Sequence, residues 1–213
     1  AYFLTWSSSF SATRYFTQFD PTYNLFAAEP YFRYTSRVEY RPGDARGEYV
    51  RGGGGSYDSF YTLNSDFVTG EGYVGPRLTL NQPYTVDIPT PFPANTGFPI
   101  DLNVRVFGRS NTQHQLEGIF NNETNTPFID TTIATNLVYI KTYSSFYSNQ
   151  NPLTETSRIR LTALKQNIDN NQLCWSSVSY DRLPDLGGDS TLVISNWDKT
   201  SKAYLELANA TGQ

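Results

Sequence analysis

Three aspartates near the C-terminal end recur at every fourth position and are the residues best suited to hold a metal ion. Asp181, Asp185 and Asp189 lie in the segment YDRLPDLGGDS, where a flexible Gly-Gly pair precedes the last acid. Carboxylate oxygens gathered by such a loop are suitable ligands for Ca²⁺. The spacing differs from that of an EF-hand loop, and aspartates in turns commonly cap the local backbone. The segment is therefore a weak calcium candidate with a solvated turn as the simpler interpretation, and we expect no cofactor.

The chain has few residues suited to nucleophilic catalysis, because it contains one histidine, His114, and one cysteine, Cys174. A nucleophilic Ser or Cys needs a base beside it, and the polar stretch SNTQH predicts an exposed loop around His114. Cys174 is expected to be a small buried apolar residue, and a single cysteine allows no internal disulfide. The chain has no Gly-x-Ser-x-Gly motif. We therefore expect a protein that is not an enzyme.

The tryptophans are candidate ligand-binding residues. Sugar rings pack on flat aromatic faces that are ringed by polar groups, and the chain combines three Trp with 16 Tyr. Trp175 and Trp197 fall in neighbouring late strand candidates, so this pair is the candidate glycan-binding site. Both also lie in apolar strand patterns, for which core packing is the alternative interpretation.

Charge and hydropathy give no strong signal for nucleic-acid binding and none for a membrane span. The formal net charge is −4, whereas nucleic-acid-binding domains carry a basic surface. No apolar run approaches the 18 residues of a membrane helix. We therefore expect neither nucleic-acid binding nor a membrane span.

Alternation of apolar and polar residues predicts the elements that must position these side chains. Period-two alternation indicates strands with one buried face, and it is clearest in Tyr31–Arg41, Ile100–Val106 and Ser157–Ala163. Further candidate strands are 1–6, 12–19, 57–63, 77–80, 84–88, 115–120, 136–143, 172–180, 190–197 and 203–208. Strands at this spacing, separated by Gly, Pro, Asn and Asp, are typical of a sandwich or a barrel. We expect an all-β antiparallel sandwich, jelly-roll-like, with long loops and little helix.

We expect residues 1–213 to form a single β-sandwich domain, because this length suits one sandwich. Residues 52–56 read GGGGS, which is typical of a flexible loop and also of an engineered linker. Residues 76–99 hold six of the twelve prolines and must be largely extended. This stretch lies at a sheet edge or covers a sheet, or else it marks a boundary between two subdomains.

One face of the strand predicted at 31–41 is rich in arginine. Arg33, Arg37 and Arg41 alternate on this face, with Glu39 as its only acid. Because like charges in line repel, acids from another segment or another subunit are expected opposite them. The three arginines are therefore candidate assembly contacts, and a solvated face whose arginine stems cover aromatic residues is the alternative.

The segments FRYTSR (32–37) and YTVDIP (84–89), with Ala1 at the start and Gln213 at the end of a chain without methionine, resemble capsid proteins of picorna-like viruses. Such proteins are jelly-roll sandwiches of about this size that a protease, commonly cutting after Gln, releases from a polyprotein. The resemblance implies a subunit of a virion whose partners are copies of itself and sister capsid subunits.

The leading hypothesis from the sequence is therefore a structural protein that self-assembles into a particle, as a viral capsid subunit does. The alternative is a secreted, extracellular carbohydrate-binding module or adhesin that uses Trp and Tyr. A glycoside hydrolase on a β-sandwich comes third, because such enzymes need a facing pair of carboxylates and the sequence singles out none.

Overall fold

The computed structural model describes residues 27–40, 48–49, 73–108, 113–121, 127–133, 139–147, 152–165, 171–189, 192 and 205–209. These ranges contain strands and no helix. The strands are β1 (Phe32–Glu39), β2 (Glu48–Tyr49), β3 (Tyr73–Val74), β4 (Tyr84–Pro89), β5 (Ile100–Gly108), β6 (His114–Phe120), β7 (Ile129–Ile133), β8 (Tyr139–Tyr147), β9 (Thr156–Ala163) and β10 (Asn171–Arg182). Accordingly, no helix in the described ranges has the length and hydropathy to cross a membrane.

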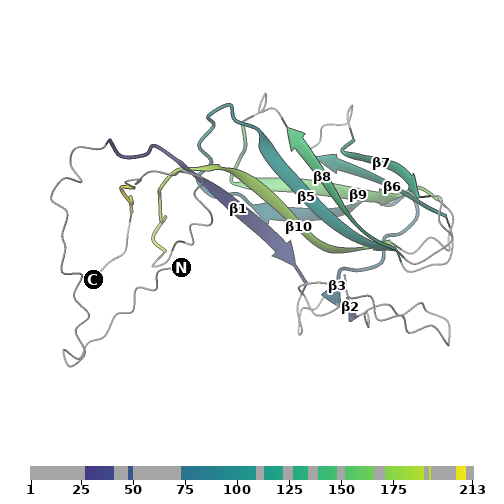
Figure 1. Ribbon diagram of the computed structural model, residues 1–213. Coiled ribbons are helices and arrows are strands. Elements are labelled where there is room, and N and C mark those ends of the chain that lie inside the picture. The colour runs from purple at the N-terminus through teal and green to yellow at the C-terminus, as the bar shows by residue number, and fades with distance from the viewer. Residues whose placement is uncertain are drawn as a thin grey trace, which may run out of the picture.

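Eight of these strands form two four-stranded antiparallel sheets that face each other (Figure 1). The front sheet has the order β1-β10-β5-β8 and the back sheet the order β4-β9-β6-β7. Along the chain, β1 lies in the front sheet, β4 in the back, β5 in the front, β6 and β7 in the back, β8 in the front, β9 in the back and β10 in the front. This is the strand order of a jelly roll. The prediction of an all-β, jelly-roll-like sandwich is confirmed.

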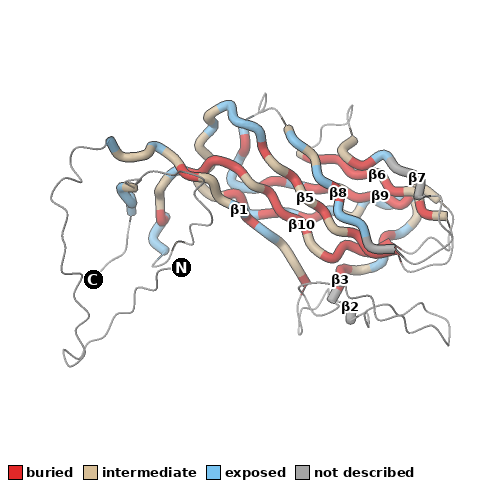
Figure 2. Tube along the Cα trace, viewed as in Figure 1, coloured by how far each residue is buried: buried red, intermediate tan, exposed pale blue. Residues whose placement is uncertain are grey.

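The core lies between the two sheets and is built from alternate residues of their strands. Strand β5 places Ile100, Leu102, Val104 and Val106 inward, each at most 4% exposed. The back sheet meets them with Val86, Ile88, Leu116, Ile159 and Leu161. Buried positions recur along the strands of both sheets in this way (Figure 2). Each such side chain contributes about 1.5–3 kcal/mol of hydrophobic stabilisation.

The strand predictions that rest on alternation agree with the structure. Tyr31–Arg41, Ile100–Val106 and Ser157–Ala163 correspond to β1, β5 and β9, and 84–88, 115–120, 136–143 and 172–180 correspond to β4, β6, β8 and β10. The candidates 77–80 and 203–208 contribute only isolated bridges. Strand β7, with the short sequence IDTTI, was not predicted. Candidates 1–6, 12–19, 57–63 and, apart from residue 192, 190–197 lie outside the described residues, as does 52–56.

The expectation for His114 is wrong. The residue opens β6 and is fully buried at 0% exposure. Strand pairing of β6 with β7 begins at His114, opposite Ile133, so its side chain takes the first buried position of a strand that alternates onward through Leu116. The polar residues before it suggested a loop, but pairing across strands decides where the loop ends.

The proline-rich stretch 76–99 first runs along an edge of the back sheet and then crosses to the front sheet. Strand β4 is an outer strand of the back sheet, and Pro89 ends it. Thr90 is buried and donates a hydrogen bond to the carbonyl of Thr154 at 2.7 Å. The chain then reaches the front sheet, where the amide of Ala94 donates to the carbonyl of Asp181 at 2.8 Å. The stretch thus joins the two layers of one sandwich.

We predict that Leu102→Ala lowers the free energy of unfolding by about 2–5 kcal/mol, because it removes a fully buried side chain from the centre of a packed core. Urea denaturation followed by tryptophan fluorescence measures the change. The control Thr85→Ala, at an exposed position of β4, should change stability by less than about 0.5 kcal/mol. Equal effects of the two substitutions would contradict the assignment of the core.

Candidate binding surface

The outer face of the front sheet carries polar side chains in rows that cross the strands. The register of β1, β10, β5 and β8 aligns Arg37, Ser177, Asn103 and Ser144 in one row. Ser144 donates a hydrogen bond to the amide oxygen of Asn103 at 2.6 Å. Two strands of the sheet therefore hold a hydroxyl and an amide in fixed relative positions.

The neighbouring row contains the only described tryptophan. It aligns Glu39, Trp175, Arg105 and Thr142 across the same four strands. Side chains directly opposite one another in antiparallel strands have Cβ atoms about 4.5–5.5 Å apart. The indole is therefore flanked by a carboxylate on one side and a guanidinium on the other.

A β-bulge places Trp175 on this outer face. The pairing of β10 with β5 shifts register between Leu173 and Trp175, so Cys174 is an extra residue in β10. Strict alternation from the inward Leu173 would turn Trp175 toward the core. With the bulge, Trp175 lies opposite Arg105 and the following Ser176 lies opposite the buried Val104.

Trp175 is half-buried and contacts both an apolar cluster and a charged side chain. It packs against the small apolar cluster of Val74, Phe107 and Cys174. The Arg37 guanidinium lies over the ring, 4.4 Å from its centroid. The Nε atom of Arg37 also pairs with a carboxylate oxygen of Glu39 at 3.1 Å. Trp197 lies outside the described residues, so the predicted pairing of the two tryptophans remains a prediction.

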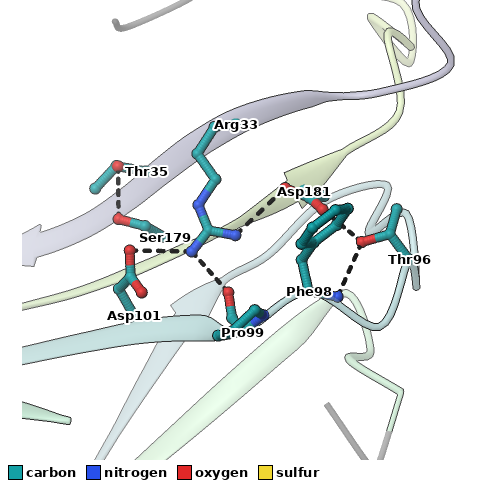
Figure 3. Close-up of polar contacts among 8 residues, drawn as sticks. All are labelled: Arg33, Thr35, Thr96, Phe98, Pro99, Asp101, Ser179 and Asp181. Atoms are coloured by element: carbon teal, nitrogen blue, oxygen red, sulfur yellow. Dashed lines mark hydrogen bonds and ion pairs between the residues drawn. The ribbon is translucent and has the colours of Figure 1, made fainter. Parts of the chain in front are cut away.

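At the other end of the front sheet, Arg33 is held by two acids of its own chain (Figure 3). Its Nη2 atom lies 3.0 Å from Asp101 Oδ2 and donates to the carbonyl of Pro99 at 2.8 Å. Its Nη1 atom lies 3.3 Å from Asp181 Oδ1, and the hydroxyl of Thr96 donates to the other oxygen of Asp181. The guanidinium thus joins β1, β5, β10 and the segment before β5.

For Arg33 the expected acids come from other strands of the same chain, whereas Arg37 pairs with an acid of its own strand. Asp101 and Asp181 face Arg33, and Glu39 faces Arg37. Arg41 lies outside the described residues. A role of these arginines in assembly remains a prediction.

The three C-terminal aspartates do not share a common set of contacts. Asp181 binds Arg33, whereas Asp185 accepts hydrogen bonds from the amide of Gly187 at 2.7 Å and from the side chain of Asn209 at 2.8 Å. Asp189 is exposed. Within the described ranges, no group of three His, Cys, Asp or Glu residues could hold a metal ion. The contacts of Asp185 fit the turn interpretation, whereas Asp181 is buried in β10 beside Arg33, so the described residues give the calcium candidate no support.

Cys174 lies in β10 of the front sheet and packs with Val74 and Phe107, whereas His114 lies in β6 of the back sheet. Burial raises the pKa of the Cys174 thiol to about 12, so the group stays protonated at neutral pH and is a poor nucleophile. The alternation in Ile100–Val106 predicts that Asn103 and Arg105 point outward, but nothing in the sequence marks them or Ser144 as binding residues.

No protein-family model matches the sequence, and no curated protein matches it. Among solved structures, dimeric latent PorU from Porphyromonas gingivalis has a TM-score of 0.49 and 12% identity over 80% of this chain, which spans 15% of PorU. The xylan-binding module CBM15 has a TM-score of 0.36 and 13% identity over 69% of this chain and 97% of the module. The CBM36-1 domain of a multidomain xylanase from the hindgut metagenome of Trinervitermes trinervoides has a TM-score of 0.35 and 10% identity, covering 68% of this chain and 95% of that domain. These values identify neither a family nor a site.

We predict that Arg33→Gln lowers the free energy of unfolding by about 1–3 kcal/mol, because it leaves the buried carboxylate of Asp181 without its cation. Thermal and urea denaturation measure the loss. Arg158→Gln is the matched control, since Arg158 pairs with Asp87 at 2.7 Å but both side chains are about half exposed, and exposed pairs contribute little. A larger loss in the control than in Arg33→Gln would refute this ranking.

We also predict that the Cys174 thiol resists alkylation by iodoacetamide in the native protein at pH 8, because burial raises its pKa to about 12. After denaturation in guanidinium chloride, the same thiol should react at the rate of an ordinary cysteine. Mass spectrometry of the alkylated protein measures both rates. Rapid labelling without denaturant would show that the thiol is accessible.

Proposed function

We propose that this chain is an extracellular binding module that holds a carbohydrate on the outer face of its front sheet. The register supports this proposal, because it places Trp175 between Glu39 and Arg105, with Arg37 and Asn103 in the adjacent row. Proteins bind sugars through planar polar side chains that hydrogen-bond hydroxyl groups and through aromatic rings that pack on the C–H face. Both kinds of group stand together on this surface.

Arg37 controls access to the indole. Its guanidinium covers one face of the ring at 4.4 Å and pairs with Glu39 at 3.1 Å. Its side chain is about one third exposed, and ion pairs at such exposure are worth at most about 1 kcal/mol. A sugar ring that displaces Arg37 replaces this ion pair and the contact of the guanidinium with the ring, which is worth about 0.5–1 kcal/mol at an exposed site. It can then pack on the indole and accept hydrogen bonds from the displaced guanidinium.

Polar groups on the outer face are fixed by contacts between neighbouring strands. Ser144 is bonded to Asn103 at 2.6 Å in the row next to Trp175, and Thr35 is bonded to Ser179 at 2.8 Å in the row beyond it. Side chains that are ordered before binding lose less conformational entropy when a ligand arrives. This pre-ordering favours recognition of a rigid ligand with regularly spaced hydroxyl groups, such as a polysaccharide chain.

Assembly into a particle, as a capsid subunit, is the second candidate. The jelly-roll strand order favours it, since viral capsid proteins and lectins both use this architecture. Arg33 and Arg37 are already paired with acids of the same chain, which removes the electrostatic argument for an intersubunit contact at this face. Electron microscopy of the purified protein tests this candidate directly, and closed particles would favour it over glycan binding.

Affinity electrophoresis and calorimetry against soluble neutral polysaccharides, including xylan, β-glucan and mannan, test the carbohydrate proposal. We expect one of these classes to bind, and Asn103→Ala with Arg105→Ala to weaken binding at least tenfold by removing hydrogen-bonding groups beside Trp175. The control Arg158→Ala, in the back sheet, should bind like the wild type. Absence of binding to every glycan, or an unchanged affinity of the folded double variant, would refute the proposal.

A further inference from the structure

Strand β8 is an edge of the front sheet, and its sequence differs from those of the other edge strands. An edge strand presents unpaired backbone N–H and C=O groups, and proteins protect such edges with charges, prolines, bulges or short strands. The edges of the two sheets are β1 and β8 in the front and β4 and β7 in the back.

Three of the four edges carry such features. Strand β1 has the charged residues Arg33, Arg37 and Glu39. Strand β4 contains Asp87 and ends in Pro89. Strand β7 is only five residues long and includes a charged residue at position 130. These edges are poor templates for pairing with another chain.

Strand β8 lacks these protective features over most of its length. It has nine residues, YIKTYSSFY, and Lys141 is its only charged residue, so the run 142–147 has no charge and no proline. Its pairing with β5 proceeds from Tyr139 to Tyr147 without a register shift, and no described strand pairs with its other side. On the outer face of the sheet, the Phe146 side chain is 75% exposed.

We propose that a second copy of this chain pairs antiparallel with β8, edge to edge, so that two front sheets form one continuous eight-stranded sheet. Such pairing is isologous, because the same strand contributes from both copies. It satisfies the backbone groups of the β8 edge and covers part of Phe146. This inference goes beyond the proposed carbohydrate binding and does not depend on it.

The side-chain pattern favours a register centred on Ser144. A two-fold axis perpendicular to the sheet keeps outer residues outer, so each residue must lie opposite one from the same face. With Ser144 at the axis, Thr142 lies opposite Phe146 of the second copy, and an aromatic residue beside a β-branched one is a favourable cross-strand pair. Lys141 then lies opposite Tyr147, which keeps the two lysines apart.

Sedimentation velocity over a range of concentrations tests the pairing with the whole chain. We expect the wild type to form a reversible dimer and Thr142→Lys with Phe146→Lys to weaken dimerisation tenfold or more, because two like-charge pairs replace two favourable ones. Thr142→Lys with Phe146→Glu should still dimerise, since opposite charges then face each other. The control Thr35→Lys adds a positive charge at an exposed position of the opposite edge β1 and should leave the dimer unchanged.

A wild type that stays monomeric up to its solubility limit would overturn the proposal. So would a Thr142→Lys/Phe146→Lys variant that dimerises like the wild type, because the contact would then lie elsewhere. Loss of the dimer in Thr142→Lys/Phe146→Glu, with circular dichroism showing a folded chain, would overturn the register centred on Ser144.

Discussion

Burial of one face of every long strand is the constraint on which the rest of this structure depends. The two sheets cover each other with residues such as Leu102 and Ile159, both at 0% exposure. Since side chains alternate between the faces of a strand, filling the core also fixes which residues point outward. The polar rows on the front sheet are therefore a direct consequence of the apolar layer beneath them.

The candidate site arises where the alternation of side chains between the two faces of a strand is locally interrupted. The register shift between Leu173 and Trp175 turns an indole outward that would otherwise enter the core. The ring then lies under the Arg37 guanidinium and beside polar groups of three strands. One additional residue in one strand thus adds an aromatic ring to the polar rows of this face. Bulges frequently re-aim side chains near functional sites in this way.

The sequence predicted the parts of the fold that depend on local pattern. Alternation identified β1, β5 and β9, together with their inward residues, because a half-buried strand leaves a period-two signature. It missed β7, whose five residues are too few for a clear period. It misplaced His114, because the burial of that residue depends on pairing with Ile133 rather than on its polar neighbours. The bulge beside Cys174 and the contact of Arg33 with Asp181 depend on register between distant segments, which no local pattern encodes.

The position of β10 determines when the front sheet can form during synthesis. This strand comes last among the long strands, yet it lies between β1 and β5. Arg33 and Asp181, which meet across the β1–β10 pair, are 148 residues apart in the sequence. Among the described strands, β10 is the only one that pairs with β1, so β1 has no such neighbour while a ribosome makes the chain until β10 emerges. Contacts of such long sequence separation slow folding, so the edge of β1 stays exposed to pairing with other chains until β10 is in place.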